Sequence, residues 1–374
     1  MNSFLTSLFL LVFTSLCAQT QVNSICLSVS DSPDSSFLPL PESVLKTRKL
    51  FLLGENHGVA INPVLILKSI KYFYARAGMR YFIIEQSPSE AMLYNRYLRT
   101  GDESLVKECW DFRYLEYIDF WRNLYAFNKT KAEKERITVI GIDFECDITF
   151  ARAIEVLKPT DKTPPPCIGP VLDSLYALLH KPGKPDYLHQ TCFQIFEDSL
   201  RVNKKAVASY FGENMLDLYQ LSGNKASFQK FGKRNKEMCT NFLYQIDYAD
   251  SAVSWFGSLG SSHVFLGDES TFAGKLNKNE FKDKVLSMPI CYDSCYSYYK
   301  YKNVMVGDNF FRLFLKHKKA LAAYQYCSKH ASCNTSWIET GSGLDETGIL
   351  NRQCQYLIYI RKQKAVTMRE GVER

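Results

Sequence analysis

The chain lacks several features that would assign it to a large class of proteins at once. Beyond its N-terminus it has no uncharged apolar segment of the roughly 20 residues that a stable transmembrane helix needs. It has neither a basic patch interleaved with aromatic residues nor a recognisable reading motif, so nucleic acid is not an expected partner. The net charge of +7 comes from 46 basic and 39 acidic residues, and the only dense charged run, 129–136, alternates in sign as a solvated surface does. There is no internal repeat.

Two common hydrolytic motifs are also missing. No G-x-S-x-G elbow occurs, because Gly257-Ser258-Leu259-Gly260 has the wrong register, and no H-E-x-x-H helix is present. These absences disfavour a serine nucleophile in a conventional triad and a zinc protease of the common helical type.

The N-terminus has the pattern of an export signal. An apolar stretch over residues 4–13 is followed by small and polar residues, so we expect a signal peptide over residues 1–20 and cleavage near Ala18 or Gln19. The mature protein is then exported, to the periplasm or the extracellular space. Lipid attachment at Cys17 is the alternative that would anchor it to a membrane.

Twelve cysteines are many for a reducing cytosol and agree with export. The local disulfides that their spacing favours are Cys291–Cys295 and Cys327–Cys333. A structural zinc site is disfavoured, because no further Cys or His pair lies at finger-like spacing around them.

The 374 residues are 46% hydrophobic, enough for a large core, and their pattern alternates between strand and helix. We therefore expect an α/β fold: a mainly parallel central sheet flanked by helices, in a single domain over 21–374. A proline-rich break at 158–170 and helical patterns after it predict an inserted helical cap at about 158–222. Strands are expected at 49–54, 80–85, 137–144, 254–266, 284–290, 320–326 and 355–361, and helices at 63–77, within 89–99 and 114–127, and at 148–157, 171–179 and 191–211.

Titratable residues follow the predicted strands. The apolar run 50–53 leads through Gly54 into Glu55, and His57 comes two residues later. Because the carboxyl ends of strands in an open α/β sheet face the ligand, a carboxylate and an imidazole there indicate an active site. A capped helix N-terminus is the structural alternative.

The same placement recurs along the chain. Glu85 ends the second strand, Asp143 and then Glu145 end the third, and the fourth brings His263 as a second isolated histidine. On a predicted helix at about 231–246, Arg234 and Asn241 share one face and could reach a common polar site. Taken alone, each residue could equally be a solvent-exposed side chain at a strand end or on a helix face. The recurrence of titratable residues at successive strands is what favours a functional site.

These residues and motifs resemble the erythromycin esterase-like superfamily, which includes haem-uptake ChaN-like proteins and Tiki-type metalloproteases. The resemblance covers residues 49–266 in order and rests on Leu53-Gly54-Glu55-Asn56-His57-Gly58, Ile84-Glu85, Gly141-Ile142-Asp143, Arg234…Met238…Asn241 and Gly260-Ser261-Ser262-His263. It implies an α/β core with Glu55, His57, Glu85, His263 and Arg234 lining the active centre, and Asp143 beside them. The esterase branch separates its first acid and histidine by two residues, whereas here only Asn56 intervenes. The chain after about Asp268 matches nothing assignable.

This set of residues is suited to hydrolysis of an ester or amide-type bond in a small-molecule or peptide substrate. His57 is the expected base with Glu55 or Glu85 as its partner, and His263 or Arg234 is expected to stabilise the oxyanion. Alternatively, Glu55, His57, Glu85, Asp143 and His263 form a nitrogen and oxygen set for a divalent Mn, Zn or Fe ion. The sequence leaves both mechanisms open, and it leaves the substrate and the oligomeric state undetermined.

A binding protein is the alternative from another class. The resemblance to ChaN-like proteins implies haem or another large planar ligand. Tyrosines that could supply a phenolate ligand are Tyr292, Tyr296, Tyr298, Tyr299 and Tyr301. An edge strand or an aromatic ligand wall is the other interpretation of this run.

Overall fold

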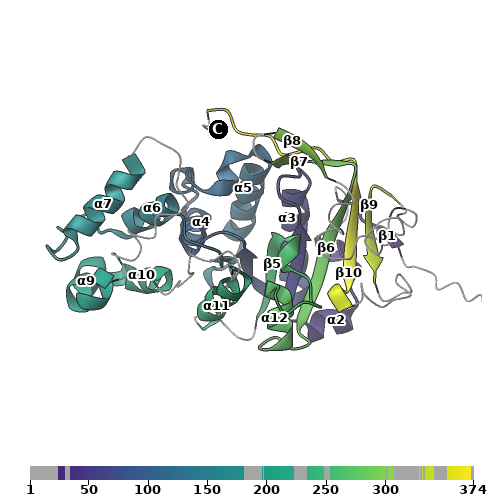
Figure 1. The fold of residues 1–374 in the computed structure, drawn as a ribbon, viewed down its shortest axis with the longest axis horizontal. Coiled ribbons are helices and arrows are strands. Elements are labelled where there is room, and N and C mark those ends of the chain that lie inside the picture. The colour runs from purple at the N-terminus through teal and green to yellow at the C-terminus, as the bar shows by residue number, and fades with distance from the viewer. Residues whose placement is uncertain are drawn as a thin grey trace, which may run out of the picture.

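An eight-stranded sheet forms the centre of the molecule (Figure 1). The computed structural model describes residues 24–29, 34–180, 196, 198–222, 234–247, 253–299, 302–306, 328, 331, 333–340 and 352–371. The strand order is β1-β9-β10-β6-β2-β5-β3-β4, and the bounds are β1 Ser24–Cys26, β2 Leu50–Glu55, β3 Met79–Ile84, β4 Thr138–Gly141, β5 Ser254–Gly260, β6 Val285–Asp293, β9 Thr335–Glu339 and β10 Tyr356–Arg361. All pairings from β10 to β4 are parallel, and only β9 pairs antiparallel, with β1 and β10. The expected α/β fold with a mainly parallel sheet is confirmed.

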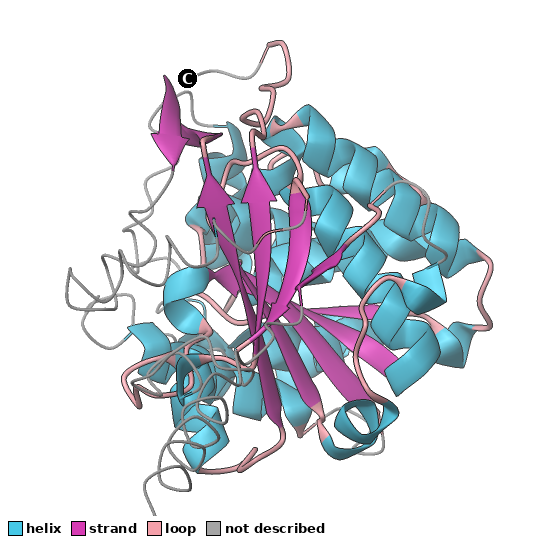
Figure 2. Cartoon of the chain, turned by 90° about the vertical axis from the view of Figure 1, so that its right-hand side faces the viewer, coloured by secondary structure: helices cyan, strands magenta, loops and turns pink. Residues whose placement is uncertain are grey.

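Helices cover both faces of this sheet, and Figure 2 shows its strands fanning between them. Their bounds are α2 Glu42–Thr47, α3 Asn62–Ala77, α4 Pro88–Thr100, α5 Leu115–Lys129, α6 Asp147–Leu157, α7 Gly169–His180, α9 Lys204–Phe211, α10 Met215–Ser222, α11 Arg234–Ile246 and α12 Phe272–Lys278. In β2, Phe51 and Leu53 belong to the core cluster that includes α3 and α5, while Leu50 and Leu52 belong to the one that includes α11 and α12. Because successive side chains point to opposite faces, a strand covered on both sides reads as continuously apolar.

The predicted insertion at 158–222 contains α7, α9 and α10. They lie beyond β4: α7 packs against α6, α10 packs against α6 and α4, and α9 lies beside α10 (Figure 1). No helix within the described residues is long and apolar enough to cross a membrane. The expected signal peptide, Cys17, Cys327 and the strand expected at 320–326 lie outside the described residues, as do residues 191–195 and 197 of the helix expected at 191–211.

The predicted strand at 254–266 is wrong in its second half. β5 ends at Gly260, and the chain continues into a short 3₁₀ helix, η7, over Ser261–His263. The turn brings the Ser261 hydroxyl to the backbone oxygen of Glu55, 3.0 Å away, and so ties the end of β5 to the end of β2.

The chain after Asp268 adds the second half of the sheet and a two-stranded hairpin of β7 (Cys295–Tyr299) and β8 (Lys302–Val306). The expected Cys291–Cys295 disulfide is wrong, because Cys295 carries a free thiol. The chain turns at Ser294, whose φ is +53°, and the Cys295 thiol is buried against the carbonyl oxygens of Asp293 and Ile360, 3.4 and 3.6 Å away. Because Cys295–Tyr299 is a strand, the interpretation of the tyrosine run as a strand is confirmed for that segment.

Candidate active site

The sheet order brings the predicted site residues to one place. The parallel strands β2, β5, β3 and β4 are neighbours in this order, so their carboxyl ends lie along one edge. Glu55 ends β2, Glu85 follows β3, and His263 ends η7 after β5. Asp143 follows β4, and Arg234 is the first residue of α11. Contacts within hydrogen-bonding or ion-pairing distance join all six expected residues, His57 included.

His57 lies between two carboxylates. Its Nδ1 atom is 2.8 Å from Oε1 of Glu55, and its Nε2 atom is 3.7 Å from Oε2 of Glu85. The His57 side chain is 62% exposed, whereas the side chains of Glu55 and Glu85 are 6% and 7% exposed. Desolvation by the surrounding protein lowers the pKa of His57, but Glu55 and Glu85 raise it by more, to well above 6.5. His57 is therefore the solvent-exposed member of this cluster, and the two buried acids favour its charged form.

Glu85 is the centre of the polar cluster. Its Oε1 atom accepts hydrogen bonds from Arg234, at 2.7 Å, and from His263, at 3.1 Å. Its Oε2 atom accepts from the backbone N–H of Gly260. Burial raises the pKa of Glu85, but His263 and His57 lower it by more, to well below the ordinary 4.5. Glu85 is therefore a buried, ionised carboxylate. A Cβ atom at position 260 would lie 3.1 Å from both Glu85 and His57, which favours glycine there.

Arg234 joins two of these strand ends. Its Nε atom donates to Oδ1 of Asp143 at 3.0 Å, and Nη2 donates to Oδ2 of Asp143 and to Glu85. Burial lowers the pKa of Arg234, but the two carboxylates raise it by more, so it stays charged. The Nη1 atom has no hydrogen-bond acceptor among the described residues, and the side chain is 29% exposed. The N–H groups of Nη1 are therefore not used by Asp143 or Glu85.

His263 has no nitrogen left for substrate. Its Nδ1 atom is 2.5 Å from the side-chain oxygen of Asn235, its Nε2 atom is bonded to Glu85, and the side chain is 7% exposed. This arrangement suits a residue that holds Glu85 in place. It is less suited to the acid or oxyanion donor expected from the sequence.

The loop that carries His57 is held by the C-terminal part of the chain. The Ser297 hydroxyl donates to the backbone oxygen of His57 at 2.5 Å. The oxygen of Gly58 accepts from the N–H groups of Tyr298, at 3.0 Å, and Val366, at 2.9 Å. Gly58 has φ +83°, and a Cβ there would lie 2.6 Å from the oxygen of Tyr298. The chain after about Asp268, which the family resemblance does not cover, therefore helps to position the exposed imidazole.

Sequence reasoning missed several members of the site. The Tyr117 hydroxyl lies 3.3 Å from Oε1 of Glu55 and shares that carboxylate with His57. Tyr117, Asn235 and Ser297 occur in ordinary helix and strand patterns that carry no signal of a site, although Asn235 is adjacent to Arg234. Asn241, expected on the same helix face as Arg234, donates to the backbone oxygen of Ile142 at 3.0 Å and so fixes the end of β4.

The expected divalent-ion set does not fit the observed geometry. No group of three His, Cys, Asp or Glu side chains in the described part of the chain is arranged to hold a metal ion. The Arg234 guanidinium donates hydrogen bonds to both oxygens of Asp143 and to one oxygen of Glu85. Its positive charge therefore lies beside two of the carboxylates that a metal ion would need as ligands. These contacts describe a cluster neutralised by protein cations.

Known proteins resemble this chain in fold only. No protein-family model and no curated protein sequence matches the chain. A solved structure of a protein from Bacillus cereus has a TM-score of 0.65 at 14% identity, covering 93% of this chain and 97% of its own. A succinoglycan biosynthesis protein has a TM-score of 0.63 at 14% identity, covering 94% and 97%. An erythromycin esterase variant in its open conformation has a TM-score of 0.56 at 10% identity, covering 89% and 94%. The resemblance expected from the sequence is confirmed at the level of the fold.

Proposed function

We propose that this protein is a hydrolase that activates water with His57 and cleaves an ester or amide-type bond in a small-molecule or peptide substrate. The observation that carries the proposal is the exposed imidazole held between two buried carboxylates. The fold shared with an erythromycin esterase supports the same reaction class.

The chemistry follows from the contacts of each atom. An ionised carboxylate only accepts hydrogen bonds, so when His57 is neutral Glu55 holds its proton on Nδ1 and leaves the Nε2 lone pair free. Nε2 takes a proton from water while the water oxygen attacks the carbonyl carbon. Glu85, 3.7 Å from Nε2, stabilises the imidazolium that forms. When the tetrahedral intermediate collapses, the leaving group takes that proton from His57.

The oxyanion of the intermediate needs a positive donor in a fixed position. Nη1 of Arg234 supplies it, because Nε and Nη2 are fixed by Asp143 and Glu85. We assign His263 as a positioning residue for Glu85, since both of its nitrogens are engaged within the protein. No step in this reaction requires a metal ion.

The test is a panel of esters and amides followed in a pH-stat with the full chain and with His57→Asn. The expected result is hydrolysis that falls about 10²–10⁴-fold in the variant, the usual contribution of a general base. His180→Asn, a histidine at the end of α7, is the matched control and keeps wild-type activity. Activity that survives in His57→Asn, or no turnover by the wild-type protein anywhere in the panel, contradicts the proposal.

Haem binding has no comparable support in the geometry. Tyr292, the first tyrosine of the expected ligand run, is buried, and its hydroxyl donates to Asn62 at 2.8 Å and accepts from the N–H of Asn56 at 3.2 Å. Burial raises the pKa of Tyr292 well above its ordinary value, which disfavours a phenolate. A Soret band that forms with stoichiometric haem and disappears in Tyr298→Phe would restore the binding alternative.

A further inference from the structure

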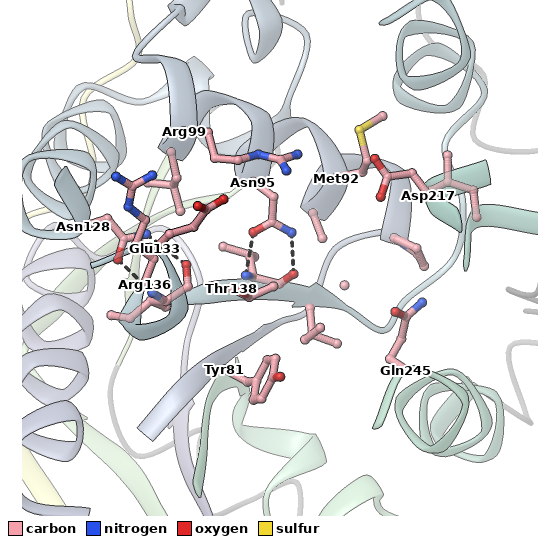
Figure 3. A pocket seen from close by; sticks show the side chains of 18 residues that line it. Tyr81, Met92, Asn95, Arg99, Asn128, Glu133, Arg136, Thr138, Asp217 and Gln245 are labelled. Atoms are coloured by element: carbon pink, nitrogen blue, oxygen red, sulfur yellow. Dashed lines mark hydrogen bonds between the residues drawn. The ribbon is translucent and has the colours of Figure 1, made fainter. Parts of the chain in front are cut away.

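A cavity of about 370 Å³ lies at the outer edge of the sheet, away from the catalytic cluster. It is lined by residues of α4, β4, α10 and α11 and of the loop before β4, and none of the six expected site residues is among them (Figure 3). Its volume is within the range of small-molecule sites. The cavity therefore has to be explained separately from the hydrolytic site.

The adjoining edge strand cannot recruit another strand at this point. The side-chain amide of Asn95 donates to the oxygen of Val139 at 2.9 Å and accepts from its N–H at 2.8 Å. Asn128 makes the same pair of bonds to Ile137, at 2.9 and 2.8 Å. Both pairs are drawn in Figure 3. Because the outward backbone groups of Ile137 and Val139 are already satisfied, a ligand here must bind to side chains rather than extend the sheet.

One amide that lines this cavity has no protein partner within the described part of the chain. Gln245, on α11, is 8% exposed and lines the cavity, and its side chain forms no hydrogen bond within the described residues. The amide is therefore available to hydrogen-bond a polar group of a ligand at this end of the cavity.

The opposite side of the cavity is positively charged. Arg99 and Arg136 both line it, and neither forms an ion pair with any described carboxylate. Of the two lining acids, Asp217 is paired with Arg96 at 3.1 Å, whereas Glu133 has no cationic partner in the described chain. Two unpaired guanidinium groups against one unpaired carboxylate leave an excess positive charge. Guanidinium groups recognise carboxylates through paired N–H donors.

Apolar side chains complete the wall between these two polar ends. They come from α4, β4 and α10, and Figure 3 shows Arg136 and Gln245 on opposite sides of the cavity. The apolar lining residues are Ala91, Met92, Leu98, Ile140 and Leu221. The matching ligand has an anionic head, an apolar body and a hydrogen-bonding group at its other end.

We propose that this cavity is a second ligand site, which binds a small organic carboxylate with an apolar body. The carboxylate pairs with Arg99 and Arg136, the body packs between α4 and α10, and a polar group of the ligand bonds to Gln245. The proposal does not depend on the hydrolytic function.

The test is isothermal titration of the full chain with three probes, benzoate, octanoate and 2-naphthoate. At least one is expected to bind saturably at one site, and its affinity is expected to fall at least tenfold in Arg99→Gln/Arg136→Gln. Gln245→Leu is expected to weaken binding only of ligands with a second polar group, such as 6-hydroxy-2-naphthoate. The neutral analogue 2-naphthalenemethanol is expected to bind at least tenfold more weakly than 2-naphthoate.

Two controls separate this site from the surface and from the hydrolytic centre. Arg201→Gln removes a guanidinium that is 72% exposed and outside the cavity, and it is expected to leave binding unchanged. His57→Ala is also expected to leave binding unchanged. No saturable binding of any of the three probes overturns the proposal, as does binding that survives in the double arginine variant or disappears in His57→Ala. Circular dichroism and the melting temperature show whether each variant is folded.

Discussion

The Nε2 atom of His57 lies 3.7 Å from the buried carboxylate of Glu85, while its Nδ1 atom lies 2.8 Å from Glu55. Glu55 therefore fixes the tautomer of the neutral imidazole, and Glu85 lies beside Nε2, the nitrogen that takes the proton in the proposed reaction. Both acids favour the imidazolium, so the base must be deprotonated before it can act.

The first prediction concerns the pH dependence of hydrolysis. Because the pKa of His57 is well above 6.5, kcat/KM is expected to rise as the pH increases through neutrality and to level off only in the alkaline range. Glu55→Gln removes one of the groups that raise this pKa, so the rising limb is expected to move to lower pH. Glu213→Gln, a change outside the cluster, is the control. An unchanged limb in Glu55→Gln would mean that another group controls the profile.

The second prediction concerns acid stability. Glu85 has a folded-state pKa well below 4.5, so its ionised form contributes stability that is fully present above 4.5 and is lost as the pH falls through the folded pKa. Urea unfolding of the wild-type protein is expected to show this loss as the pH is lowered from about 5 through the folded-state pKa. Glu85→Gln leaves Arg234 and His263 without their shared acid, and it is expected to cost about 3–5 kcal/mol at pH 7. Its free energy of unfolding should depend less steeply on acid pH, and equal slopes for the two proteins would contradict this account.

The third prediction is that hydrolysis proceeds without a metal ion. Arg234 is bonded to the carboxylates that a divalent ion would need, so chelation with EDTA is expected to leave the rate unchanged. Elemental analysis of the purified protein beside His57→Ala is the direct measurement. Near-stoichiometric Mn, Zn or Fe that disappears in the variant would replace the proposed reaction with a metal-assisted one.

The fourth prediction concerns the loop that carries His57. Ser297→Ala removes the hydroxyl that bonds to the backbone oxygen of His57, and we expect kcat to fall about tenfold while the protein stays folded. Ser297→Thr keeps a hydroxyl and is expected to restore most of the rate. Steady-state kinetics and melting temperatures of both variants test this. A loss of kcat that Ser297→Thr does not restore, or that is accompanied by unfolding, would mean that Ser297 contributes to packing and does not position His57.

Part of this site could be predicted because its residues follow a pattern along the chain. Glu55, Glu85 and Asp143 each come at or just after the end of a buried apolar strand, and the parallel arrangement brings such ends together. The strand order that makes these ends neighbours had to be assumed, and the structure supplies it. The resemblance to a known superfamily supplied the link to Arg234 and His263.

The rest of the site depends on contacts between distant parts of the chain. Ser297 and Val366 reach the His57 loop from beyond residue 268, and nothing in their local sequence marks that contact. Tyr117 reads as one more aromatic residue on the buried face of a helix. The wrong Cys291–Cys295 disulfide has the same origin, since sequence spacing does not show that the turn at Ser294 directs the Cys295 thiol into the core.

Helix α11 begins with Arg234 at the catalytic cluster and carries Gln245 near its other end, where that residue lines the outer cavity. At a rise of 1.5 Å per residue, about 16 Å of rigid helix separates the two side chains. A ligand bound to Gln245 therefore contacts the same helix that holds the Arg234 guanidinium at the polar cluster. If filling the cavity shifts this helix, occupancy of the cavity and affinity for a transition-state analogue are linked, and by reciprocity each changes the other by the same factor.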